Sequence, residues 1–160
     1  MAEPAFREAP RPEELAQGDL LESVEFLAPQ GRTYRDNNWA KGIVVSHSCD
    51  FTKFQSDEEK GRKNLDRIPL LVAPVVPFSS IGDASTADHA RKGRVMRYFH
   101  LPAEGPLAGE EEHFVDFWFI QPASVFELLD ISRLASMSDE WQSRLQIGLD
   151  RFFARTEIRP

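Results

Sequence analysis

The sequence predicts a mainly β protein, a small and mostly antiparallel barrel with long inserted loops and a closing C-terminal helix. Three observations support this prediction. About five strand-sized apolar segments follow one another, long polar stretches separate them, and one amphipathic helix comes last. The chain has 160 residues, enough to bury a core of its own. Its single cysteine excludes an intramolecular disulfide.

Each predicted strand carries its own signal. The segments are residues 19–27, 42–46, 68–78, 95–101 and 113–120. Apolar and polar residues alternate in the first, and a turn-forming Pro-Gln-Gly follows it. The second is continuously apolar, which is typical of a buried strand. Prolines in the third place its ends at an edge or a bulge. The fifth is mostly apolar on both faces, which predicts burial on both sides.

One C-terminal segment has a clear helical pattern. Trp141, Leu145, Leu149 and Phe152 recur at spacings of four, four and three, which predicts one apolar stripe along a helix. Ser138 precedes this stripe and is a suitable N-cap residue. We expect the stripe to pack against the sheet.

The same patterns predict the domain organisation. Residues 1–17 are expected to form a flexible N-terminal tail with a short helical turn, because their prolines are closely spaced. Residues 18–155 are expected to form a single barrel domain with its C-terminal helix. Two polar insertions, residues 52–67 and 79–94, make the long loops, and the second can hold a short helix.

Charge and hydropathy narrow the class of protein. The net charge is −7, which argues against a protein that coats nucleic acid, because such proteins need clustered Lys and Arg. Two basic clusters, residues 60–63 and 91–94, are typical of solvated loops. The chain shows no basic, apolar signal segment and no apolar run of about 20 residues. We therefore expect a cytoplasmic protein with no membrane partner.

The end of the second predicted strand concentrates potential chemistry. The apolar run is followed by Ser46, His47, Cys49 and Asp50. Strand ends are places where a rigid scaffold directs side chains into a cleft. These residues are therefore the first candidates for a functional site.

Three kinds of chemistry are open to this cluster. In metal-independent RNA cleavage, His47 would serve as general base or acid, Asp50 would orient it, and Lys41, or else Arg32 or Arg35, would hold the phosphate. Alternatively, Cys49 would be a thiolate nucleophile if a base lay close to it.

A metal site is the third reading. It would join His47, Cys49 and Asp50 to His100 or His113. Only one short ligand pair is visible and no second cysteine exists, so we expect neither a metal nor another cofactor. The alternative without a functional role is that these side chains form hydrogen bonds with backbone amides of the loop and that Cys49 fills apolar space. Trp39 and Phe54 are candidate stacking platforms for single-stranded bases, or they cover the barrel mouth.

The order of these segments resembles the MazF/PemK family of toxin endoribonucleases over roughly residues 18–155. The similar stretches are residues 18–21, 43–46, 71–75, 114–120, 132–134 and 137–138 with the helix that follows. The resemblance implies an SH3-like barrel that cuts single-stranded RNA without a metal, is restrained by an antitoxin and forms a homodimer.

Two departures from that family bear on activity. The family's arginine-proline pair falls at Ala40-Lys41-Gly42, where Lys41 supplies charge without the bidentate guanidinium. The family's catalytic threonine falls near Val76, which has no hydroxyl, while Ser79 and Ser80 lie slightly downstream. The alternative is therefore a catalytically silent barrel that serves as a protein-interaction module in a bacterial or phage-associated defence or regulatory assembly.

Overall fold

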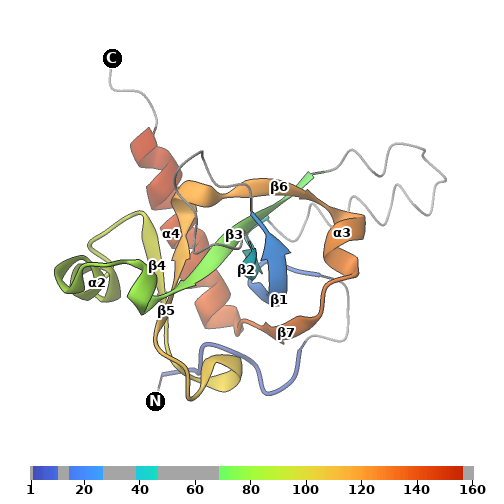
Figure 1. Ribbon diagram of the computed structural model, residues 1–160, viewed down its shortest axis with the longest axis horizontal. Helices are drawn as coiled ribbons and strands as arrows, with labels where there is room; N and C mark the ends of the chain where they lie inside the picture. The colour runs from blue at the N-terminus through green and yellow to red at the C-terminus, as the bar shows by residue number, and fades with distance from the viewer. Residues whose placement is uncertain (1, 11–14, 27–38, 47–68, 157–160) are drawn as a thin grey trace.

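A computed structural model describes residues 2–10, 15–26, 39–46 and 69–156, and these residues form a curled antiparallel sheet with a C-terminal helix (Figure 1). The strands are β1 (Asp19–Glu25), β2 (Trp39–Val44), β3 (Pro69–Pro77), β4 (Tyr98–Leu101), β5 (His113–Asp116), β6 (Gln121–Ser124) and β7 (Arg133–Ser136). The helices are α2 (Ala84–Arg91), α3 (Val125–Leu129) and α4 (Asp139–Thr156). The predicted mainly β, small barrel-like architecture with a closing helix is confirmed.

The sheet is built around its longest strand, β3. Its order is β4-β5-β3-β2-β1-β7, and every pairing is antiparallel. One edge of β3 pairs with β2, whereas the other pairs with β6 along its first half and with β5 near its end. Register shifts interrupt β1 on both of its edges. Such irregularities increase local twist and help a sheet to curl.

Both faces of the curled sheet are buried. Leu20, Ile43 and Val75 belong to one apolar cluster, which also receives α4. Leu21 and Val44, their neighbours in sequence, belong to a second cluster on the opposite face. Successive residues of a strand point to opposite faces, so an apolar residue at every position predicts this double burial.

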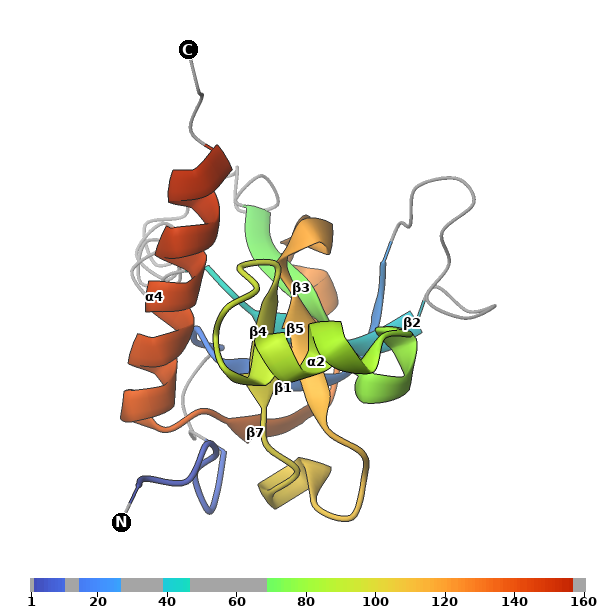
Figure 2. The ribbon, with the colours of Figure 1, turned by 90° about the vertical axis from the view of Figure 1, so that its left-hand side faces the viewer.

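Helix α4 closes the first cluster. Leu145 and Leu149 are buried in it, and Trp141 and Phe152 pack against its margin, as the helical spacing predicts. Figure 2 shows α4 lying along one side of the sheet. The expected side-chain cap is absent, because the buried Ser138 hydroxyl has no hydrogen-bond partner within the described residues. The Ser138 carbonyl instead accepts the amide of Gln142 at 2.8 Å.

Helix α2 covers the far end of the sheet. The carboxylate of Asp83 accepts the amides of Ser85 and Thr86 and caps its first turn. Ala87 and Ala90 then pack, in a third cluster, with residues of β3 and β5. The insertion 79–94 is therefore partly helical and attached to the sheet.

The N-terminal segment differs from the expected flexible tail. Ala5 and Phe6 are buried, and Phe6 forms an antiparallel bridge with Met137. The amide of Arg7 donates to the carbonyl of Ser136 at 2.9 Å. Apolar burial and main-chain pairing thus hold residues 5–7 against β7, despite the prolines nearby. The predicted helical turn falls mainly on residues 11–14, outside the described residues.

Several strand boundaries also differ from the sequence predictions. Residues 39–41, which lie before the second predicted strand, belong to β2, whereas residues 95–97 of the fourth predicted strand precede β4. The fifth predicted strand stops at Asp116, whose carboxylate accepts the Trp118 amide and starts a 3₁₀ turn. After this turn the chain re-enters the sheet as β6. Within the described ranges, no helix has both the length and the apolar character needed to cross a bilayer.

Candidate functional site

The candidate site lies where β2, β3 and β5 run side by side. Lys41 of β2 is registered with Val75 of β3, and Val75 is registered with Val115 of β5. His113 opens β5 two residues earlier, opposite Pro77. Three segments that are distant in sequence therefore bring Lys41 and His113 to one part of the sheet.

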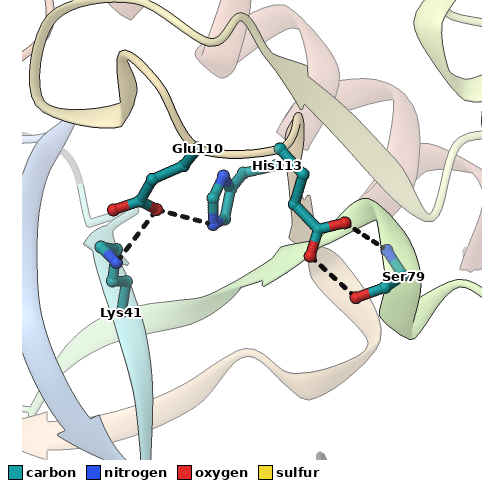
Figure 3. A network of polar contacts seen from close by, with 5 residues as sticks. Lys41, Ser79, Glu110 and His113 are labelled. Carbon is teal, nitrogen blue, oxygen red and sulfur yellow. Dashed lines mark hydrogen bonds and ion pairs between the residues drawn. The ribbon is translucent and has the colours of Figure 1, made fainter.

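Glu110 connects these two residues. One of its carboxylate oxygens, Oε2, lies 3.4 Å from Lys41 Nζ and 3.5 Å from His113 Nε2. Figure 3 shows the Glu110 carboxylate between the lysine and the imidazole. The Lys41 and Glu110 side chains are partly exposed, at 27% and 44%, so this cluster can meet a ligand from solvent.

The imidazole of His113 is enclosed. Its side chain is 7% exposed, and its Nδ1 atom is buried without a hydrogen-bond partner among the described residues. Burial lowers the pKa of His113 below the usual histidine value, against the opposing effect of the Glu110 charge. A neutral ring therefore contacts Glu110 near pH 7.

The neighbouring glutamates attach the same loop to the sheet and to α2. Glu111 accepts hydrogen bonds from the Ser79 amide at 3.2 Å and the Ser79 hydroxyl at 2.8 Å. Glu112 accepts from Arg91 at 2.5 Å and lies 3.6 Å from His100 Nε2. These contacts hold in place the two residues that directly follow Glu110.

A cavity of about 420 Å³ opens beside this cluster. The polar and aromatic residues that line it are Trp39, Lys41, Ser80, Glu110, Glu111 and His113. Trp39 is 56% exposed, so its ring is available for contact with a flat group. The cavity therefore combines one cation, two carboxylates, one imidazole and one exposed aromatic ring.

The structure describes only some of the residues predicted from sequence. Lys41 lies in this cavity, and Ser46 is buried, where its hydroxyl accepts the Leu71 amide at 2.5 Å. His47, Cys49 and Asp50 lie outside the described residues, as do Arg32, Arg35 and Phe54. Val76, near which the sequence resemblance would place a threonine, is buried in β3 and lines the cavity.

The described residues give no support to the hypothesis of a metal site. No group of three or more His, Cys, Asp or Glu side chains within the described ranges is placed to hold a metal ion. His100 and His113, the two additional ligands considered from sequence, contact different glutamates.

Glu110 and His113 acquire their roles from the tertiary structure. The sequence signal that was available is their i, i+3 spacing just before a strand, where a charged loop meets a buried segment. It did not identify Lys41 as their partner, because 69 residues separate Lys41 from Glu110.

Comparison with known proteins does not assign this chain to a family. No protein-family model matches the chain, and no curated protein matches its sequence. The function must therefore be inferred from the residues themselves.

Proposed function

We propose that this protein cleaves single-stranded RNA, without a metal, at the cavity beside Lys41. The observation that carries the proposal is the convergence of Lys41 Nζ and His113 Nε2 on the same oxygen of Glu110, 3.4 and 3.5 Å away. This arrangement supplies a cation, a carboxylate base and a positioning group at the wall of an open cavity. The role is the one implied by the family resemblance, but its residues come largely from β5 and the preceding loop.

The chemistry requires proton transfers at two oxygens. In the proposed step the RNA 2′-oxygen attacks the adjacent phosphorus, and the bond from phosphorus to the 5′-oxygen breaks. Glu110 takes the proton of the 2′-hydroxyl, while the Lys41 ammonium stabilises the phosphate charge and protonates the departing 5′-oxygen. A proton then passes from Glu110 to Lys41 across their 3.4 Å contact, which restores both groups.

His113 acts in this scheme as a positioning residue. Its ring is too enclosed to meet the substrate directly, but its Nε2 atom contacts the Glu110 oxygen that also faces Lys41. A fixed ring beside a flexible glutamate reduces the number of orientations the carboxylate can adopt.

Trp39 would contact a nucleobase of the RNA. Its exposed ring lines the cavity that holds Lys41 and Glu110. Stacking of a base on an aromatic ring contributes about 1–3 kcal/mol and tolerates different bases. A single strand is favoured over a duplex because stacking on Trp39 needs an unpaired base.

The test measures cleavage of a mixed single-stranded RNA pool with and without EDTA. Glu110→Gln should lower the rate about 100-fold, because it removes the base while keeping the side-chain shape. Glu22→Gln is the matched control, since Glu22 is exposed on β1 and lies away from the cavity. His47→Ala tests the site predicted from sequence.

Cleavage that resists EDTA and is lost in Glu110→Gln supports the proposal. Cleavage abolished by EDTA, or no cleavage by protein shown to be folded, contradicts it. If His47→Ala abolishes cleavage while Glu110→Gln cleaves at the original rate, the reaction belongs to the end of the second strand and not to Glu110.

A further inference from the structure

A separate surface lies between α4 and the segment that leads into β4. Two adjoining cavities, of about 350 and 700 Å³, share Arg94, Val95, Met96 and Tyr98 as lining residues. The first reaches Ile147 and Arg151 of α4, and the second reaches Trp118. Neither cavity shares a lining residue with the cavity beside Lys41. We name this surface the arginine face: Arg94, Met96, Arg97, Trp118, Ile147 and Arg151.

The arginine face has a charge opposite to that of the whole protein. The chain carries a net charge of −7, yet among the residues that the structure describes no Asp or Glu lines either cavity. Arg94 and Arg151 form no ion pair within the described part of the chain. Arg97 and Arg144 are paired, with Asp116 and Glu140. Two guanidinium groups that have no ion-pair partner among the described residues therefore border the cavities, where an anionic partner can reach them.

The same face exposes apolar side chains. Met96, Trp118 and Ile147 are 38%, 59% and 51% exposed, and all three line one or both of the cavities. These three are half of the six large exposed apolar residues in the described ranges. A concentration of this kind marks an interaction surface, because isolated monomer surfaces rarely gather such residues.

One aromatic ring on this face is held in place without being covered. The guanidinium of Arg97 stacks over Trp118, with Arg97 Cζ 4.2 Å from the ring centroid, while it bonds the buried carboxylate of Asp116. The Trp118 amide also donates to Asp116 at 3.1 Å. A ring that is already ordered loses little conformational freedom when a partner buries it.

We infer that the arginine face docks an acidic segment of a partner protein that carries apolar anchor side chains. The anchors would enter the two cavities, and carboxylates beside them would pair with Arg94 and Arg151. Arginine, methionine and aromatic residues, the types that make up most of this face, are enriched at protein interfaces. The inference does not depend on RNA cleavage at Lys41.

Two other occupants fit less well. Met96 and Ile147 offer aliphatic surface, which an apolar side chain buries and a nucleic-acid base does not stack on. A second copy of this chain has one prominent acidic run in the described residues, Glu110 to Glu112. All three of its glutamates already have partners in their own chain.

The test begins with selection of random short peptides displayed on phage, with the full-length protein as bait. Counter-selection uses Arg151→Glu. The enriched peptides should combine acidic residues with Leu, Phe or Trp. A fluorescently labelled peptide from the enriched set is then titrated against the protein by anisotropy. Arg94→Glu and Arg151→Glu should each weaken binding about tenfold. Trp118→Ala should weaken it through loss of an anchor contact.

Arg7→Glu is the matched control, because it makes the same charge change at an exposed arginine that lines neither cavity. It should leave the peptide affinity within about twofold of the original value, since separated surface charges are screened by salt. Equal weakening by Arg7→Glu and Arg151→Glu would show a general charge effect and overturn the inference.

Three further outcomes would also overturn it. The first is enrichment of no peptide, or of basic peptides only. The second is tighter binding of labelled oligouridylate than of any peptide, with sensitivity to Arg151→Glu, which would assign the face to nucleic acid. The third is a dimer seen by light scattering that Ile147→Glu dissociates, which would assign the face to self-association.

Discussion

The guanidinium of Arg97 and the carboxylate of Asp116 meet through two parallel hydrogen bonds, 2.9 Å from Nε to Oδ1 and 2.7 Å from Nη2 to Oδ2. Asp116 is fully buried, whereas the Arg97 side chain is 24% exposed. The pair ties the end of β5 to the residue just before β4 and fixes the start of the 3₁₀ turn at Trp118.

Removal of one partner of this pair should destabilise the fold strongly. We expect Asp116→Ala to lower the free energy of unfolding by about 3–5 kcal/mol, because it removes the carboxylate that accepts two hydrogen bonds from a largely enclosed guanidinium. Arg97→Met with Asp116→Leu should lose less, since neither charge then remains. Urea denaturation followed by circular dichroism measures both. A loss below about 1 kcal/mol in Asp116→Ala would show that solvent replaces the carboxylate.

The N-terminal segment should contribute to stability even though it precedes the barrel. Phe6 is 5% exposed in the cluster that α4 closes, so Phe6→Ala should lower the free energy of unfolding by about 3 kcal/mol. The exposed neighbour Arg7→Ala should change it by less than about 0.5 kcal/mol. Chemical denaturation distinguishes the two. Equal, small effects would mean that the segment does not pack in solution.

Helix α4 offers a matched pair of aliphatic residues two positions apart. Leu145 is fully buried, whereas Ile147 is 51% exposed on the arginine face. We expect Leu145→Ala to cost about 2–5 kcal/mol of stability, through lost burial and the cavity it leaves. Ile147→Ala should cost under about 1 kcal/mol. The reverse ranking would contradict the orientation of the helix.

The buried histidine His113 should make stability depend on pH. Burial lowers the pKa of His113 in the folded protein, so the unfolded chain binds a proton more readily than the folded one. Its contribution is present above the unfolded histidine pKa of about 6.5 and declines as the pH falls below that value. The decline ends once the pH falls below the folded pKa.

Denaturation at several pH values measures this effect. His113→Gln should reduce the loss of stability between pH 7.5 and pH 5, because glutamine does not titrate. His89→Gln is the control, since His89 is exposed on α2. Identical pH dependence in the original protein and His113→Gln would show that the folded histidine is protonated as easily as the unfolded one.

Much of the fold follows from local patterns. The spacing of Leu145 and Leu149 predicts the buried stripe of α4, and the apolar run at Ile43 predicts a strand buried on both faces. Strands β6 and β7 are short, and their pairing rather than their composition defines them. The sequence does not predict the 3₁₀ turn after Asp116, because the apolar residues Phe117 and Trp118 continue the pattern of a strand. The turn depends on the hydrogen bond that the Asp116 carboxylate accepts from the Trp118 amide.

At the candidate site, too, the local sequence predicts one residue and not its partners. The residue type of Lys41 and its place just before the second predicted strand were enough to suggest a phosphate contact. Its partner Glu110 comes from a loop beyond β4. Charged loop residues are common, so no local pattern distinguishes a glutamate that meets a lysine across a cavity from one that faces solvent.

The sequence by itself determined that the protein is mainly β, that a helix closes it, and that the core occupies both faces of the sheet. These properties follow from the period of apolar residues, which acts over a few neighbouring positions. Only the tertiary structure decided that Glu110 joins Lys41 to His113, and that Arg94 and Arg151 border one pair of cavities. These long-range contacts depend on the strand order and on the path of the loops, because contacts between distant segments produce no periodic pattern in the sequence.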